Sequence, residues 1–368
     1  MTRSIAVATP GAHEPRGLSE WMLDQFAEAD GLLQQVLVVV RNDPQLDLQI
    51  RKHYVNIYYR GSSLMEIRQP ARTGKRLTTR FDKRYLPEFA KRPWPATAEE
   101  EQAHEWLKAH DVLGLLDLAD AADVRRHLAS FPYRKAAIGA WLERRPKLER
   151  QAQQEIVRLN NAAAGGEYLI CDIEYAFKYW DTESKRHTGR VDMVAAYRPR
   201  PKVPGAAAQL AFIEVKYGVS AIDGAAGLQK HVTDLHGLLG RGDLQHRAEE
   251  MVGLVEQKRA LGLISAEAPT FDLTAPLVYV IAGASHNDRS QRLRDALLGS
   301  EGRGESRLAW PEGVDARVTI LGDDMTLRHD CMVACDDITE DRVPPEIFCG
   351  RKLRDRSPRA TRPAQAAH

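Results

Sequence analysis

The alternation of apolar and polar positions divides the first 133 residues into a helical start, a β-rich middle and a helical end. Residues 19–30 favour a short helix. Between residues 36 and 82, runs rich in β-branched and aromatic residues are separated by turn-forming residues, which predicts a small antiparallel meander; the runs are 36–40, 53–59, 64–68 and 77–81. Thr97 and Glu100 form a capping box that predicts a helix to about residue 118, and two more helices are expected over 122–130 and 134–144.

From residue 134 onward, helical and strand-like patterns alternate. Pro146 suits the first turn of a helix that would run to about residue 163, before Gly165 and Gly166. Strands are then expected at 168–177, 190–197, 209–217, 276–282 and 316–321, and helices at 221–239, 244–261 and 287–298. This order predicts an α/β fold, in which a mixed central sheet is flanked by helices.

Four segments follow from these patterns. Residues 1–17 are expected to be a flexible lead-in, and 18–133 a module of β-meander plus helices that binds a substrate or a partner. Residues 134–350 are expected to form the α/β core, and 351–368 a disordered basic tail. The length of 368 residues is enough for two domains.

Composition narrows the class of protein without indicating a partner. Hydrophobic residues make up 43% of the chain and charged residues 28%, as in ordinary globular proteins. The net charge of +1 gives no overall attraction to a polyanion, so only local charge can indicate one. No apolar stretch approaches the roughly 20 residues that span a bilayer, no apolar signal region opens the chain, and the four cysteines do not form a disulfide framework. We therefore expect a cytoplasmic protein with no membrane contact.

Two familiar kinds of site find no support in the sequence. His329, Cys331 and Cys335 lack the spacing of a zinc ribbon or finger. No glycine-rich phosphate-binding loop of the ATPase type is present, so ATP use is not indicated.

Two of the predicted strands carry two acids and one amine among apolar neighbours. Side chains alternate between the faces of a strand, so Glu214 and Lys216 share one face and Val215 points to the other. If the strands of Asp192 and Glu214 pair as a hairpin, the two carboxylates come close together. An ordinary surface ion pair is the alternative, but burying these groups is costly unless they bind something. Carboxylate oxygens suit Mg²⁺ or Mn²⁺, and Lys216 would then serve the attacking water.

Asp192, followed by Glu214-Val215-Lys216, resembles the signature of the PD-(D/E)xK nuclease superfamily. The order of elements over residues 152–283 is similar to that family as well. The resemblance implies a restriction-endonuclease-like core, with Asp192, Glu214 and the main-chain carbonyl of Val215 as ligands of Mg²⁺ or Mn²⁺. It also implies that Glu155 is the acid of the preceding helix and a further metal ligand, with Glu143, Glu149 and Glu174 as rivals.

The resemblance extends to the helix after the ExK strand, where Gln229 matches a catalytic glutamine of some members. Val191 stands where the family often has proline, and Thr233 stands where exonuclease-like members often have tyrosine, so the subfamily stays open. Asp172 and Glu174, in the strand before, are expected to be ordinary polar-face residues.

Residues 68–92 hold nine basic residues with aromatic residues between them. Basic groups neutralise phosphates and aromatic faces stack on bases, so this stretch is a candidate nucleic-acid surface. Its predicted contacts are Arg72, Lys75, Arg76, Arg80, Lys83 and Arg84. The alternative is a solvated hairpin whose aromatic rings are buried.

These observations predict a Mg²⁺-dependent nuclease that hydrolyses phosphodiester bonds, in DNA more than in RNA, such as an endonuclease of antiviral defence or repair. A second hypothesis is a nucleic-acid-binding module with a nuclease-like fold and no catalysis. A third is a sensor subunit of a larger assembly, with protein partners or as a homo-oligomer, whose nuclease is silent until activated. The defence hypothesis rests on fold-level analogy.

Overall fold

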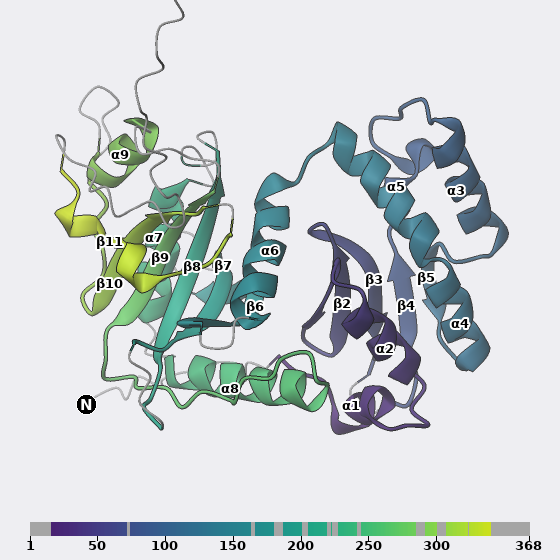
Figure 1. The fold of residues 1–368 in the computed structure, drawn as a ribbon, viewed down its shortest axis with the longest axis horizontal. Coiled ribbons are helices and arrows are strands. Elements are labelled where there is room, and N and C mark those ends of the chain that lie inside the picture. The colour runs from purple at the N-terminus through teal and green to yellow at the C-terminus, as the bar shows by residue number, and fades with distance from the viewer. Residues whose placement is uncertain are drawn as a thin grey trace, which may run out of the picture.

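The computed structural model describes residues 16–71, 74–162, 166–179, 187–200, 205–218, 222, 227–240, 244–284, 291–299, 307–322 and 324–339. Within them the chain is a mixed α/β protein with two sheets and flanking helices, which confirms the predicted class (Figure 1). The predicted lead-in up to residue 15, the predicted contact Arg72 and the predicted tail 351–368 lie outside the described residues. None of the helices in the described part is long and apolar enough to cross a membrane.

The N-terminal part is built on a five-stranded antiparallel sheet in which the strands follow one another in chain order. Its strands are β1 (Leu46–Ile50), β2 (Tyr54–Tyr59), β3 (Ser62–Arg68), β4 (Thr78–Phe81) and β5 (Gly114–Asp117). The helices of this part are α1 (Glu20–Ala27), α2 (Gln34–Asn42), α3 (Ala98–Ala109), α4 (Ala121–Ala129) and α5 (Phe131–Arg144). Val55, Ile57 and Ile67 belong to the same hydrophobic core as these helices, so the opposite face of the sheet is the polar one.

Residues 36–40 belong to α2, so the predicted strand there is wrong. Leu33, Val36, Leu37 and Val40 are buried, whereas Val38 is 39% exposed. Positions i, i+3, i+4 and i+7 form one face of a helix, and burial of that face outweighs the β-propensity of valine. A run of valines thus packs α2 against the sheet instead of extending it.

The capping box at Thr97 is confirmed, but the helix that it begins is shorter than predicted. The Glu100 N–H donates to Thr97 Oγ1 at 3.3 Å, and the Thr97 N–H donates to the Glu100 carboxylate at 3.1 Å. Helix α3 ends at Ala109, and Asp111 then adopts a positive φ of 47°. This left-handed residue turns the chain out of the helix and into β5, which pairs with β4.

The second part is built on a six-stranded mixed sheet with the order β11-β10-β9-β8-β7-β6. Its strands are β6 (Tyr168–Tyr179), β7 (His187–Tyr197), β8 (Gln209–Tyr217), β9 (Leu277–Ala284), β10 (Val314–Ile320) and β11 (Val333–Ala334). Strands β6, β7 and β8 pair antiparallel, β8–β9 and β9–β10 pair parallel, and β10–β11 pair antiparallel. The helices are α6 (Leu148–Ala162), α7 (Leu228–Leu239), α8 (Leu244–Ala260) and α9 (Gln291–Leu298).

Helices cover both faces of this second sheet. Ile156 of α6 shares a hydrophobic cluster with Val215, whereas Val232 of α7 shares another with Phe212. Since side chains alternate along β8, Glu214 lies on the face of Phe212, toward α7. Figure 1 shows α6 in the space between the two sheets, where its first turn is near the loop that arrives from α5.

Buried polar contacts join the N-terminal part to the second part. The Arg51 guanidinium donates to Asp172 Oδ1 at 2.7 Å, and the Arg16 guanidinium donates to Oδ2 at 2.5 Å. Asp172 is 1% exposed, so it is not the ordinary polar-face residue that the sequence indicated. Lys258 of α8 adds a contact to Gln49 of β1 at 2.8 Å. The partners come from distant parts of the chain, which is why the pattern around Asp172 did not reveal them.

Candidate active site

Strands β7 and β8 separate from each other at Asp192 and Glu214, and we call this place the strand fork. The paired residues run from Tyr197↔Gln209 to Met193↔Ile213. Beyond them β7 continues its pairing with β6, and β8 continues its pairing with β9. At the fork the Val215 N–H donates to Asp192 Oδ2 at 2.9 Å. This bond holds Asp192 beside Glu214, as the predicted hairpin required.

Glu214 and Lys216 form a buried ion pair at the strand fork. They are 1% and 3% exposed, and Lys216 Nζ donates to Glu214 Oε1 at 2.8 Å. His231 of α7 places its Nε2 atom 2.9 Å from the same Oε1 and 3.1 Å from Lys216 Nζ. Depending on the tautomer, this nitrogen either donates to the carboxylate or accepts from the amine. The other carboxylate oxygen, Glu214 Oε2, is buried and has no hydrogen-bond partner among the described residues.

The acids at the fork differ in pKa. Burial raises the pKa of Asp192 well above its usual value, and Glu214 and Glu149 raise it further, against the Val215 N–H and Lys216. Burial would raise the pKa of Glu214 too, but His231 and Lys216 hold that pKa below its usual value. Burial raises the pKa of Glu149, Lys216 opposes the effect and Glu214 adds to it. The fork therefore holds three carboxyl groups beside one amine and one imidazole, and two of the three have raised pKa values.

The helix acid that the structure brings to the fork is Glu149, whereas Glu155 lies elsewhere on α6. Glu149, in the first turn, interacts electrostatically with Asp192 and Glu214. Glu155 accepts a hydrogen bond from Arg158 Nε at 3.0 Å, and that contact holds its pKa low. Six residues along an α-helix separate two side chains by about 9 Å along the axis and about 120° around it. The two acids therefore cannot serve the same site from one helix.

The residue of α7 that reaches the fork is His231, whereas Gln229 is exposed. The backbone carbonyl of Gln229 accepts from Thr233 Oγ1 at 3.0 Å, an ordinary contact one turn along the helix. The sequence prediction did not include His231. The helical period could have indicated His231. Residues three and four positions after the buried Leu228 lie on the same face of the helix as Leu228, whereas Gln229 does not.

The donor atoms at the fork fit a hard divalent cation. Asp192 and Glu214 offer carboxylate oxygens from neighbouring strands, and the buried Glu214 Oε2 atom has no other partner in the described part of the chain. Val215, the predicted carbonyl ligand, lies between Glu214 and Lys216, and its side chain packs on the opposite face. In the residues that the structure describes, no three His, Cys, Asp or Glu side chains converge as they stand. Mg²⁺ does not need three, because it keeps several waters and takes one or two carboxylates.

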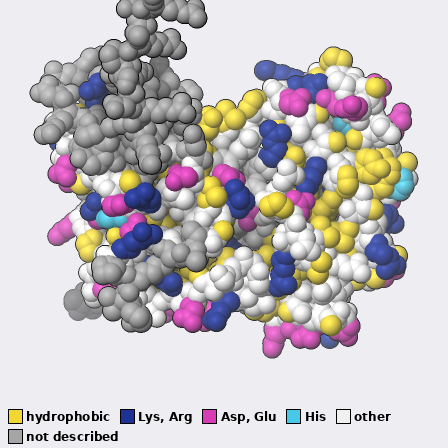
Figure 2. Space-filling view, viewed as in Figure 1, with side chains coloured by type: hydrophobic (Ala, Val, Ile, Leu, Met, Phe, Trp, Pro, Cys, Tyr) yellow, Lys and Arg dark blue, Asp and Glu magenta, His cyan; other side chains and the backbone are white. Residues whose placement is uncertain are grey.

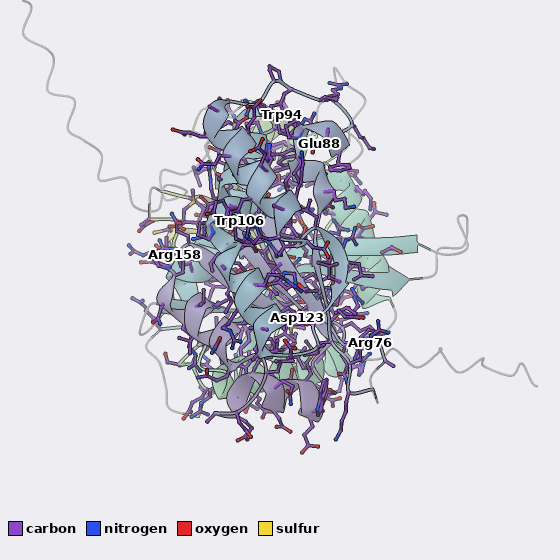
Figure 3. All side chains as sticks on the ribbon, turned by 90° about the vertical axis from the view of Figure 1, so that its right-hand side faces the viewer. Arg76, Glu88, Trp94, Trp106, Asp123 and Arg158 are labelled. Carbon is purple, nitrogen blue, oxygen red and sulfur yellow. The ribbon has the colours of Figure 1, made fainter. Side chains whose placement is uncertain are left out.

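Three of the predicted nucleic-acid contacts gather at one cavity, which residues of β3, β4 and β5 line. Arg76, Arg80 and Lys83 line this cavity, whose volume is about 830 Å³. Arg76 is paired with Asp117 at 2.5 Å, so its charge is partly neutralised. Figure 3 shows Arg76 and Arg158 at opposite sides of the molecule, so this cavity is remote from the exposed side of α6 that carries Glu155 and Arg158.

The remaining predicted contacts do not form one basic surface. Arg84 pairs with Asp82 at 2.8 Å, and Lys75 is exposed at the start of the segment before β4. Figure 2 shows positive and negative side chains interspersed over the visible face, with no large field of either sign. Contacts with a polyanion would therefore depend on individual cations that lack an acidic partner.

No family model, curated protein or solved structure matches the chain.

Proposed function

We propose that this protein is a metal-dependent nuclease of the PD-(D/E)xK kind, which hydrolyses phosphodiester bonds at the strand fork. The observation that carries the proposal is the set of three carboxyl groups around one amine: the buried Asp192 and Glu214 and the half-buried Glu149 beside Lys216. Unneutralised buried carboxylates cost stability, and a divalent cation would relieve that cost. A mixed sheet with α6 on one face and α7 on the other supports a restriction-endonuclease-like core.

Asp192 and Glu214 would hold Mg²⁺ or Mn²⁺, together with the main-chain carbonyl of Val215. Bound there, the cation supplies Lewis-acid neutralisation of the charge that develops at phosphorus. The Lys216 ammonium orients the attacking water and stabilises the negative charge that forms on the phosphate oxygens.

Two further residues act through these groups. His231 contacts the Glu214 carboxylate and so fixes its orientation, as partners of metal ligands do in other metal sites. Glu149 adds negative charge beside Asp192 from the first turn of α6, where the helix dipole favours an acid. Glu155 pairs with Arg158 and Gln229 is exposed, so both stay out of this proposal.

We propose DNA, more than RNA, as the substrate, with defence or repair as the setting. A first test is cleavage of labelled single- and double-stranded DNA and RNA with Mg²⁺ or Mn²⁺. Lys216→Ala should lower the rate by at least about 10³-fold, as expected for loss of a group that stabilises the transition state. Asp192→Asn should lower it similarly, and its amide oxygen can still accept from the Val215 N–H, so the fold is kept.

Lys108→Ala is a matched control, because Lys108 is exposed, is paired with Glu88 and lies in α3. It should cleave like the unmodified protein, and circular dichroism should show that all variants are folded. Equal cleavage by Lys216→Ala and Lys108→Ala would reject the proposal. Binding of nucleic acid without cleavage under any metal would instead favour a silent binding module or a sensor subunit.

A further inference from the structure

A polar pocket of about 320 Å³ lies between the polar face of the N-terminal sheet and the start of α6, and we call it the inter-sheet pocket. Its walls come from both parts of the chain, with Arg80 of β4 on one side and Lys147 and Arg150 on the other. The strand register places Asn56, Glu66 and Arg80 in one row across β2, β3 and β4. Every side chain that lines the pocket is polar or aromatic.

The pocket has a surplus of positive charge. Three acids line it, and each is already paired with an arginine: Glu66 with Arg68 at 3.1 Å, Asp82 with Arg84 at 2.8 Å and Glu174 with Arg150 at 2.8 Å. The two other cations of the lining are Arg80 and Lys147, and neither has a carboxylate partner among the described residues. Two cations without acidic partners facing one small cavity favour an anionic occupant.

The lining also favours an anion that carries a ring and hydroxyl groups. The rings of Tyr54 and Tyr58 and the amide of Asn56 line the pocket beside the cations. A volume of about 320 Å³ is at the lower end for ligand pockets and is large for a bare phosphate. Phosphate oxygens would contact Lys147 and Arg80, and the sugar and base would contact the aromatic and amide groups.

The start of α6 connects the pocket with the strand fork. Lys147 and Arg150 line the pocket, and Glu149 between them interacts electrostatically with Asp192. Glu174, which pairs with Arg150, comes between Ile173 and Tyr175 of β6, and these pair with Met193 and Val191 on either side of Asp192.

We propose that the inter-sheet pocket binds one phosphate-bearing nucleotide of the DNA strand that is cut. The proposal rests on the proposed nuclease function and assigns substrate binding to the N-terminal sheet. The chemistry recognised is that of a nucleoside phosphate, which could also come from a free mononucleotide, so the test separates the two sources.

The test is fluorescence anisotropy with a fluorescein-labelled single-stranded DNA oligonucleotide, in EDTA so that no cleavage occurs. Lys147→Ala should weaken binding by about threefold to tenfold and lower the slope of log K against log salt by about one. Arg80→Ala should do the same. In the second arm, unlabelled deoxynucleoside monophosphate competes with the labelled oligonucleotide. If the monophosphate displaces the oligonucleotide at a similar concentration, the ligand of the pocket is the free nucleotide and not a nucleotide of DNA.

Lys108→Ala is the matched control. Lys108 is exposed, is paired with Glu88 and does not line the inter-sheet pocket. Equal affinities and salt slopes for Lys147→Ala and Lys108→Ala would overturn the proposal.

The same experiment separates this inference from the nuclease proposal. Lys147→Ala should weaken binding in EDTA, whereas Lys216→Ala should abolish cleavage in Mg²⁺. Failure of the pocket would leave cleavage intact, with equal oligonucleotide binding by Lys147→Ala and Lys108→Ala. Failure of the nuclease would leave Lys147-dependent binding without cleavage.

Discussion

Two buried ionic clusters lie on neighbouring strands of the second sheet, and they differ in how many of their carboxylate oxygens have a partner. In the first, on β6, Asp172 gives one oxygen to Arg51 and the other to Arg16. In the second, at the strand fork, Glu214 shares one oxygen between Lys216 and His231 and leaves the other without a described partner. Asp192 and Glu149 stand beside it with raised pKa values.

The difference separates a structural cluster from a candidate functional one. Burial of a charge is tolerated when each oxygen has its own partner, and the Asp172 cluster meets that condition across two parts of the chain. At the fork three carboxyl groups lie beside one amine and one imidazole, and we propose that this arrangement binds a cation. Perturbed carboxylates of this kind are typical of functional sites.

Breaking the Asp172 cluster should have the largest effect on stability. Asp172→Ala leaves Arg16 and Arg51 without their carboxylate in a buried position, and we expect a loss of roughly 3–5 kcal/mol in the free energy of unfolding. Urea denaturation followed by circular dichroism measures this. A loss below about 1 kcal/mol would mean that the two clusters are not as different as described.

Replacing each acid of α6 in turn tests which of the two acts at the fork. Glu149→Ala should reduce Mg²⁺-dependent cleavage by about 10–100-fold, the usual effect of residues that support metal ligands. Glu155→Ala should change it by less than about twofold, because its partner is the exposed Arg158. Steady-state cleavage rates of the two variants decide this, and a larger effect for Glu155 would restore the family-based assignment.

The smallest expected effect is on the pH dependence of stability without metal. A carboxyl whose folded-state pKa is raised binds more proton in the folded state, so the free energy of unfolding falls as pH rises from about 3.9 toward that raised pKa. Asp192→Asn removes this contribution and should stabilise the metal-free protein at neutral pH by on the order of 1 kcal/mol. Urea denaturation in EDTA at several pH values measures it. A variant that is less stable than the unmodified protein at neutral pH would contradict the account.

The strands that form the fork could be predicted from the sequence because local patterns determine them. Alternation along β8 placed Glu214 and Lys216 on one face, and hairpin pairing brought Asp192 beside them. The valine run at 36–40 was misassigned because a short apolar run fits a strand or a buried helix equally, and only packing of α2 decides between them.

The residues that the sequence did not reveal depend on three-dimensional neighbours. Which acid of α6 interacts with the fork depends on where the first turn of this helix meets the sheet, and no local pattern contains that position. His231 required knowing which face of α7 packs on the sheet. The partners of Asp172 come from residues 16 and 51, more than 100 positions away in the chain, so no local pattern contains them.

The central claim, that the carboxylates of the strand fork form a cation site, is tested most directly by Mn²⁺ binding without nucleic acid. Titration of the metal-free protein, followed by the electron paramagnetic resonance signal of free Mn²⁺, measures it. We predict binding by the unmodified protein and by Asp172→Asn, and a loss of at least about tenfold in affinity for Asp192→Asn. Absence of Mn²⁺ binding, or equal affinity in Asp192→Asn, would contradict the claim.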